Sequence, residues 1–314
     1  MRVIILGSAA GGGLPQWNCG CRNCQEARLS GTGRTQSSVA VSADGARWVL
    51  LNASPDLRVQ VASRPELWPR GARGTPISAA VCTDGELDHT LGLLLLREAT
   101  TKLAVYAPPG VAGLLDREWP LFRILSAYAG LEPRTLPDGQ AIALADAAGT
   151  QLGIACTAVP VARRPPRYAR QAAAGTYDVG LRLTDERTGG TLAYVPAAGA
   201  VDDAVRSVAA GAGLLLFDGT FWSDDELAGA GGGGGAGGAG RAGRADAASA
   251  REMGHLPVGG PEGSMQLLPR VGAQRTVLVH INNTNPMLSR SSAERAQVEA
   301  AGLEVGDDGM EFEL

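Results

Sequence analysis

Short apolar runs of β-strand character recur along the chain, and helical stretches are interspersed among them. Such strands must bury their apolar faces, and two packed sheets with helices outside is a layer arrangement that suits this order. The sequence therefore indicates an α/β fold. Strands are expected at residues 3–6, 39–42, 48–51, 79–82, 103–107, 153–159, 178–183, 191–195, 214–217 and 276–280, with an edge strand within 303–314. Helices are expected at residues 91–98, 112–119, 262–268 and 292–301.

The composition is that of a globular domain with a substantial core. Of 314 residues, 45% are hydrophobic and 19% are charged, which argues against disorder over the whole chain. A net charge of -4 and 4% aromatic residues make nucleic acid a poor partner. The sequence has no apolar run long enough to predict membrane insertion. With no signal peptide and an odd number of cysteines, 5, we expect a cytoplasmic protein without a disulfide framework.

Residues 228–245 interrupt this pattern with a stretch made largely of Gly and Ala. Such a composition buries too little apolar surface to offset the entropy lost on ordering, so we expect a flexible surface insertion. A phosphate-binding loop is the alternative. The stretch lacks both the strand–Gly-x-Gly-x-x-Gly–helix context and the Lys-Ser/Thr of such loops. We therefore expect residues 1–314 to form a single domain that carries this insertion.

Three thiols lie within six residues, at Cys19, Cys21 and Cys24. Thiolates at this spacing can converge on one soft metal ion, and zinc is the usual ion in such sites. A closed zinc site needs a fourth ligand, which a His, Asn, Asp or water would supply. The alternative is a reduced surface cluster or a redox pair. Cys82 and Cys156 lie in apolar strand-like runs and are expected to be buried.

A dense group of ionisable side chains follows the expected strand at residues 79–82, and its members are Asp84, Glu86, Asp88 and His89. Loops between a strand and a helix often carry ligands. A carboxylate next to an imidazole suits Fe(II), Zn or Mn. The alternative is capping of the following helix by Asp84 or Asp88, with Glu86 in its first turn.

Two other expected strands also end in potential ligands, Asp218 and His280, and His255 lies between them in the sequence. All three histidines of the chain are therefore in polar turns rather than on apolar faces. A lone histidine is usually structural, but three in such positions favour a shared site. Three asparagines follow His280 and either form the turn, orient the histidine or supply a ligand.

The segment at residues 83–93 resembles the signature of the metallo-β-lactamase fold, Thr-His-x-His-x-Asp-His-x-x-Gly-Leu. The positions that the sequence keeps are Asp88, His89, Gly92 and Leu93. It carries Asp84 and Glu86 where the signature has its first two histidines. Asp218 resembles the later bridging aspartate of that fold, and His255 and His280 resemble its later histidines.

Longer motifs resemble the pyrroloquinoline quinone (PQQ) biosynthesis protein B family over nearly the whole chain. They are residues 7–13, 15–19, 34–38, 51–56, 83–85, 88–89, 218–221, 253–255 and 280–286. The resemblance implies an αββα sandwich with a metal site at the edge of its two sheets, and a structural zinc held by the three cysteines. Related phosphodiesterase-like proteins complete that zinc site with a histidine where this chain has Asn283, so the fourth ligand stays open.

The altered signature bears on the expected metal. Asp84 and Glu86 are hard oxygen donors that would weaken the two-zinc site of the parent fold. The candidate ligands of a single active-site metal are Asp88, His89, His280 and Asp218. Such a His/carboxylate set with open positions suits non-haem Fe(II) and O2.

The resemblance also implies the reaction, which is hydroxylation of the tyrosine ring in a peptide-derived Glu-Tyr precursor of PQQ. The expected catalytic residues are Asp84, Glu86, Asp88, His89, Asp218, His255 and His280. A non-catalytic carrier of PQQ or its precursor is one alternative, and a metal-dependent hydrolase, argued from fold analogy alone, is another. Other PQQ-biosynthesis proteins are expected partners, and the oligomeric state, a homodimer included, is left open.

Overall fold

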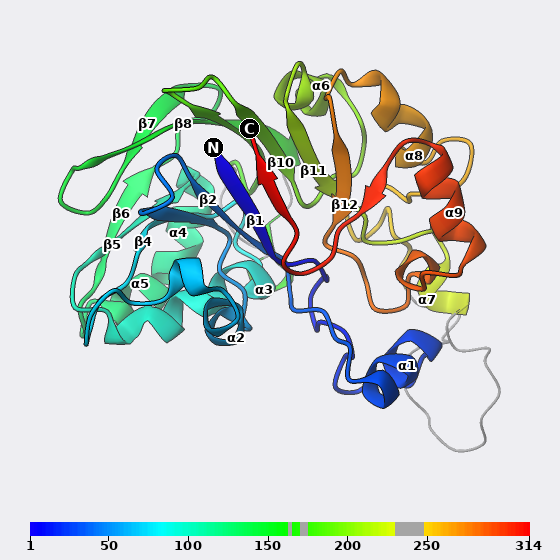
Figure 1. Cartoon of the computed structure of the whole chain (residues 1–314), viewed down its shortest axis with the longest axis horizontal. Helices are drawn as coiled ribbons and strands as arrows, with labels where there is room; N and C mark the ends of the chain where they lie inside the picture. Colours follow the sequence, from blue (N-terminus) through cyan, green and yellow to red (C-terminus); the bar gives the residue numbers. More distant parts are fainter. Residues whose placement is uncertain (163–164, 170–174, 230–247) are drawn as a thin grey trace.

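In this computed structural model, which describes residues 1–162, 165–169, 175–229 and 248–314, two mixed sheets pack face to face (Figure 1). The first sheet contains β14 (Glu311–Glu313), β1 (Arg2–Gly7), β2 (Ser38–Ser42), β3 (Trp48–Leu51), β4 (Ile77–Val81), β5 (Leu103–Ala107) and β6 (Leu131–Thr135), in that order. The second contains β13 (Glu304–Val305), β12 (Thr276–Val279), β11 (Leu214–Asp218), β10 (Thr191–Val195), β9 (Asp178–Asp185), β8 (Gln151–Ala162) and β7 (Ala141–Ala145). Strands β3 to β6 are parallel, and so are β10 to β13.

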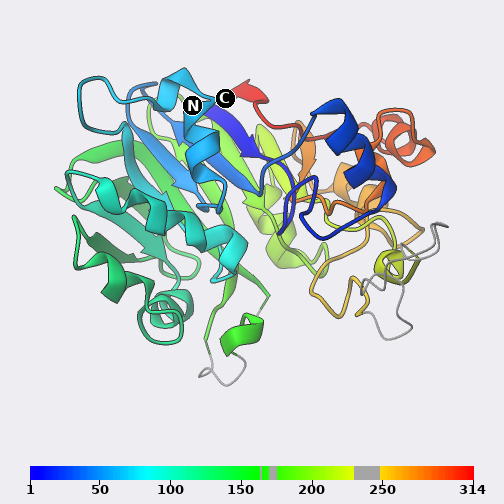
Figure 2. The same ribbon diagram turned by 90° about the horizontal axis from the view of Figure 1, so that it is seen from below.

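Helices cover the outer faces of both sheets (Figures 1 and 2). On the first sheet lie α2 (Leu57–Ala62), α3 (Leu87–Thr90), α4 (Pro109–Arg117) and α5 (Leu121–Leu125), with the 3₁₀ helices η1 (Pro65–Leu67) and η2 (Leu91–Glu98). On the second lie α6 (Asp203–Ala209), α8 (Ser264–Leu267) and α9 (Ala293–Ala300), with η4 (Leu268–Arg270) and η5 (Pro286–Leu288). The remaining helices are α1 (Arg22–Ser30), α7 (Glu226–Gly229) and η3 (Arg167–Ala169). The αββα sandwich expected from the sequence is confirmed.

Both faces of the central strands are buried, which explains why these strands are continuous apolar runs in the sequence. In β1, Val3 and Ile5 lie in the core between the two sheets, whereas Ile4 packs toward the helices of the first layer. In β11, Leu216 lies between the sheets and Leu215 packs toward the helices of the second layer. The two-residue period of a strand thus divides each run between two cores.

Several elements differ from the sequence expectation. Residues 91–98 form a 3₁₀ helix, η2, and the tail supplies two edge strands, since β13 joins the second sheet and β14 the first. Strands β6 and β7 were not expected because they lie at sheet edges, where half-exposed positions weaken the apolar pattern. Helix α1 was not expected either, because it buries little besides Cys24 and Ala27.

The predicted Gly/Ala insertion, residues 228–245, lies outside the described residues from 230 onward, and its first two residues end α7. Its flexibility and the single-domain organisation stay predictions. Among the described residues, none of the helices has the length and apolarity needed to cross a membrane.

Candidate metal centre

The predicted site residues come together at one edge of the sandwich. Asp84 and His89 follow β4 of the first sheet, whereas Asp218 ends β11 and His280 follows β12 of the second. The carboxyl ends of parallel strands are where open α/β sheets bind ligands. His255 joins them from the loop before α8, so that two sheets supply one site.

His89 is buried and is oriented by Asp84. Asp84 Oδ2 lies 2.7 Å from Nδ1 of His89 and also accepts from the Thr83 hydroxyl, while Oδ1 accepts from the Glu86 amide. An ionised carboxylate only accepts hydrogen bonds, so Nδ1 of His89 donates to Asp84 and Nε2 is the ring atom left to bind a metal. Nε2 is buried without a hydrogen-bond partner and lies 3.8 Å from Asp88 Oδ2. Such an atom is costly unless it binds something.

His280 has a backbone φ of 56°, in the left-handed region that residues other than glycine seldom adopt. Its Nδ1 lies 2.8 Å from Thr220 Oγ1, and this hydroxyl donates to Asp218 Oδ1 at 2.6 Å. Because the hydroxyl proton goes to the carboxylate, Nδ1 of His280 donates to the Thr220 oxygen. Nε2 lies on the opposite side of the ring, 3.4 Å from Asp88 Oδ2.

His255 is oriented by the fully buried Asp218, whose two carboxylate oxygens both accept hydrogen bonds. Oδ1 accepts from the amide and hydroxyl of Thr220. Oδ2 accepts from a backbone amide between β10 and α6 and lies 2.7 Å from Nδ1 of His255. The ring centroids are 5.0 Å apart for His89 and His280, and 5.5 Å apart for His255 and His280. All three imidazoles are thus held through Nδ1 and lie next to one another.

The arrangement fits a divalent cation. Two groups of side chains offer ligand atoms within 4.8 Å of one another, namely Asp88, His89 and His280, and Asp218, His255 and His280. Burial opposes a charged His89, yet Asp84 and Asp88 outweigh it and raise the pKa of His89 to about 10. The site therefore favours positive charge. With the unpartnered Nε2 of His89, this N/O donor set suits a transition metal.

Asp84 and Glu86 do not occupy ligand positions. Asp84 is used in hydrogen bonds to His89, Thr83 and a backbone amide, so it acts on a metal through the imidazole. Glu86 is exposed at the rim of the site and belongs to neither group. The capping alternative for Asp84 and Asp88 is wrong, because α3 begins after Glu86 without a side-chain cap.

Asn52 was not singled out by sequence analysis, although its motif was. It has a φ of 60°, and its Oδ1 accepts from the amide of Thr83 at 2.9 Å. Its Nδ2 donates to the Thr83 hydroxyl at 2.9 Å and lies 3.4 Å from the hydroxyl of the buried Tyr194. Because Thr83 donates to Asp84, Asn52 stabilises the loop that orients His89. The signal that could have identified Asn52 is an asparagine directly after an apolar strand, since Asn tolerates this backbone region.

Asp178 was also missed. It is the first residue of β9 and forms an isolated bridge with Asp84. Burial and then the carboxylates of Asp84 and Glu86 raise the pKa of Asp178 to about 8. This carboxyl is therefore more readily protonated than an ordinary aspartate. The sequence carries no signal for it, because an aspartate at the start of a strand is typical of a turn.

The glycine-rich segment after β1 passes close to the metal centre. A Cβ atom at Gly11 would lie 3.1 Å from Asp88 Oδ2 and 3.3 Å from its Cγ. A side chain there would press on the carboxylate that faces His89 and His280. This contact gives a physical reason for glycine at this position.

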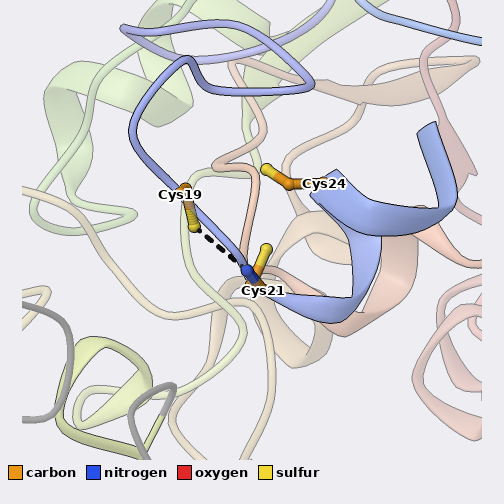
Figure 3. Close-up of side chains that lie close together, drawn as sticks. All are labelled: Cys19, Cys21 and Cys24. Atoms are coloured by element: carbon orange, nitrogen blue, oxygen red, sulfur yellow. Dashed lines mark hydrogen bonds between the residues drawn. The ribbon is translucent and has the colours of Figure 1, made fainter. Parts of the chain in front are cut away.

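The three cysteines of the predicted zinc site converge, as Figure 3 shows. Their sulfur atoms lie within 4.8 Å of one another, and the Cys21 amide donates to Cys19 Sγ at 3.4 Å. The buried Asn283 joins them, with its side-chain amide 3.5 Å from Cys21 Sγ and 3.3 Å from Cys24 Sγ. Burial and then the two neighbouring thiols raise the pKa of Cys21 to about 12. Thiolates this close repel one another unless protons or a cation neutralise their charge, so the donor set fits zinc.

Comparisons with known proteins show which sequences and folds the chain resembles. The family model described as "Beta-lactamase superfamily domain" matches residues 47–281. "Coenzyme PQQ synthesis protein B" of Cupriavidus necator is 43% identical over 319 residues, which cover 99% of each chain. The protein of the same name from Methylococcus capsulatus is 42% identical over 320 residues, which cover 100% of each chain.

Among solved structures, Zn(2+)-bound PqqB from Methylobacterium extorquens superposes with a TM-score of 0.86 at 38% identity, and 100% of each chain is covered. A diphosphatase from the PhnP family has a TM-score of 0.65 at 21% identity, covering 100% of this chain and 97% of that one. The second likeness concerns the fold alone.

Proposed function

Since the chain belongs to the coenzyme PQQ synthesis protein B family, within the β-lactamase superfamily, we propose that it acts in PQQ biosynthesis as an iron-dependent hydroxylase. The substrate is the tyrosine ring of a peptide-derived Glu-Tyr precursor. The reaction inserts one oxygen atom of O2 into a ring C–H bond and reduces the other to water, so it also consumes two electrons from an added reductant and two protons.

The observation that supports this proposal best is the shared orientation of the three histidines. Each is held through Nδ1, which leaves Nε2 of His89 and His280 facing Asp88 Oδ2. Asp88, His89 and His280 would hold Fe2+, with His255 or Asp218 as a further donor. When bound, iron in a set of histidine and carboxylate ligands supplies O2 chemistry.

The surrounding residues have separate roles. Asp84 orients the imidazole of His89, and Asp218 orients that of His255. The Thr220 hydroxyl orients His280 in the same way. The raised pKa of Asp178, whose backbone is bridged to that of Asp84, suits it to proton transfer near the reacting ring. The second metal of the proposal is a structural Zn2+ bound by Cys19, Cys21 and Cys24 with Asn283 as fourth ligand. The Asn283 amide reaches the sulfur atoms, and a rotation of this amide would present its oxygen.

The test is anaerobic loading with Fe2+, followed by O2, a two-electron reductant and the dipeptide Glu-Tyr. We expect the catechol product from the wild type and none from His89→Ala. The Zn2+-loaded protein serves as the redox-inactive control. Absence of turnover in the iron-loaded wild type, or unchanged turnover in His89→Ala, would refute the hydroxylase.

A carrier of PQQ or its precursor is a second candidate, favoured by the replacement of two signature histidines by Asp84 and Glu86. PQQ binding that needs no iron and survives Asp88→Ala would support it. A hydrolase is a third candidate that rests on the fold alone. Hydrolysis of phosphodiesters or amides with two zinc ions per centre would support that activity.

A further inference from the structure

The short helix η3 lies against the loop that carries the metal ligands. It is the short green helix beside the grey trace in Figure 2. Tyr168 Oη donates to the carbonyl oxygen of Gly85 at 2.7 Å. A Cβ atom at Gly85 would lie 3.1 Å from Tyr168 Oη and 3.4 Å from Pro166 Cγ, so this loop and the η3 region are in close contact. Gly85 is followed directly by Glu86 at the rim of the centre, so η3 lies beside this part of the ligand loop.

Arg167, the residue before Tyr168, carries an exposed guanidinium beside this loop. Its side chain is exposed and forms neither a hydrogen bond nor an ion pair with any residue in the described part of the chain. The guanidinium is close enough to Glu86 to act on its carboxylate electrostatically, although no ion pair joins the two side chains.

The rest of the site is acidic. The ionised carboxyl groups around it are those of Asp84, Glu86, Asp88 and Asp218. Like charges repel an approaching carboxylate. An acidic substrate therefore needs a cationic side chain to bind it at the rim.

We propose that Arg167 binds a free carboxylate of the substrate at the rim of the metal centre and so selects acidic amino-acid or peptide substrates. A guanidinium binds a carboxylate through two parallel hydrogen bonds, which fixes direction as well as position. Tyr168 is a positioning residue, because its bond to Gly85 keeps η3 beside the ligand loop. The choice of an acidic peptide rests on the proposed function.

The test measures binding to the Zn2+-loaded protein by calorimetry, so that turnover does not interfere. The probes are Glu-Tyr and Gln-Tyr-amide, which has uncharged amides in place of both carboxylates. We expect the wild type to prefer Glu-Tyr. Arg167→Gln should lose about tenfold or more in affinity for Glu-Tyr, the size of a charge-assisted pair, and keep its affinity for Gln-Tyr-amide. Arg167→Lys should fall between them, because lysine keeps the charge but not the planar fork.

The matched control is Arg73→Gln. Arg73 is exposed like Arg167, but it precedes β4, at the end of the strand opposite the metal centre. The Arg73→Gln protein should bind both peptides as the wild type does. Tyr168→Phe keeps the guanidinium but removes the hydrogen bond to Gly85, and a smaller loss for Glu-Tyr is expected.

Three results would overturn the role of Arg167. They are unchanged Glu-Tyr affinity in Arg167→Gln, an equal loss for both peptides, and a wild type that does not prefer Glu-Tyr. Hydroxylation is measured separately with Fe2+. Binding that depends on Arg167 without any hydroxylation would refute the redox activity alone. Normal hydroxylation with unchanged KM in Arg167→Gln would refute the role of Arg167 alone, since the proposal expects KM to rise at unchanged kcat.

Discussion

The donor atoms of this centre depend on hydrogen bonds at the far side of each imidazole ring. Asp84, Thr220 and Asp218 occupy the three Nδ1 atoms, and the Nε2 atoms of His89 and His280 then face one carboxylate. Such partners of metal ligands set ring orientation and basicity, and their loss typically weakens metal binding 10- to 100-fold.

The variant Asp84→Asn tests whether metal binding depends on the hydrogen-bond partner of His89. Asparagine has the same shape but no charge, so Nδ1 of His89 loses its strongest partner. We expect metal affinity at the centre to fall about 10- to 100-fold while the cysteine site keeps its zinc. Competition with a chelator, followed by metal analysis, measures both. Asp203→Asn is the control, because Asp203 is exposed in the first turn of α6. Equal affinity in Asp84→Asn and Asp203→Asn would contradict the prediction.

Residue type explains which members of the site could be predicted from the sequence. Histidines and acids at the ends of apolar strands are unusual enough to be noticed, and Asp88, His89 and His280 do come together. Thr220 and Asn52 are ordinary turn residues by type. Their roles depend on contacts with partners 60 and 31 positions away in the chain, which no local pattern contains.

At the scale of elements, η2 packs directly on the loop after β3. The Gly92 amide donates to the Ala53 carbonyl oxygen at 2.9 Å. A Cβ atom at Gly92 would lie 2.1 Å from the Ser54 carbonyl oxygen, a distance that no side chain tolerates. The glycine of the signature is therefore needed for the approach of a helix to a backbone, rather than for metal binding.

Gly92→Ala should consequently destabilise the fold. We expect a loss of about 1–3 kcal/mol in the free energy of unfolding, as in overpacked cores, measured by urea denaturation. Gly113→Ala in α4 is the control, because its nearest contact is the end of the flexible Arg117 side chain. Alanine is favoured over glycine inside a helix, so this variant should be as stable as the wild type or slightly more so. A Gly92→Ala protein as stable as the Gly113→Ala protein would contradict the close contact.

The elements that sequence analysis found are those with a complete apolar run. The strands β3 and β10 match their expected bounds residue for residue, because every residue of Trp48–Leu51 and nearly every residue of Thr191–Val195 is buried. Edge strands and the half-exposed α1 carry no such run. Their formation depends on neighbours that only the folded chain supplies.

At the scale of the whole molecule, one loop contributes to both candidate metal sites. His280 begins the loop and Asn283 contacts the cysteine sulfurs, while Asn23 donates to the carbonyl oxygens of Asn283 and Asn285. The cysteine segment and the active-site loop are thus joined, although each site has its own ligands.

Metal analysis of reciprocal variants tests that separation. We expect two kinds of metal in the wild type, of which Cys21→Ser loses zinc and His89→Ala loses the other. Each variant is the control of the other, and thermal unfolding shows whether both are folded. Loss of both metals from a folded Cys21→Ser protein, or retention of both, would contradict two independent sites.

The pairing of β1 with β14 has a consequence for biosynthesis on the ribosome. The first strand of the sandwich finds its outer neighbour at residues 311–313, and the centre joins residues 88–89 to residue 280. Neither the first sheet nor the ligand set can be completed while those late residues are still inside the exit tunnel. Contacts this far apart in the chain form slowly. We therefore expect metal loading to follow synthesis, and we expect the nascent chain to expose an open sheet edge that chaperones would shield.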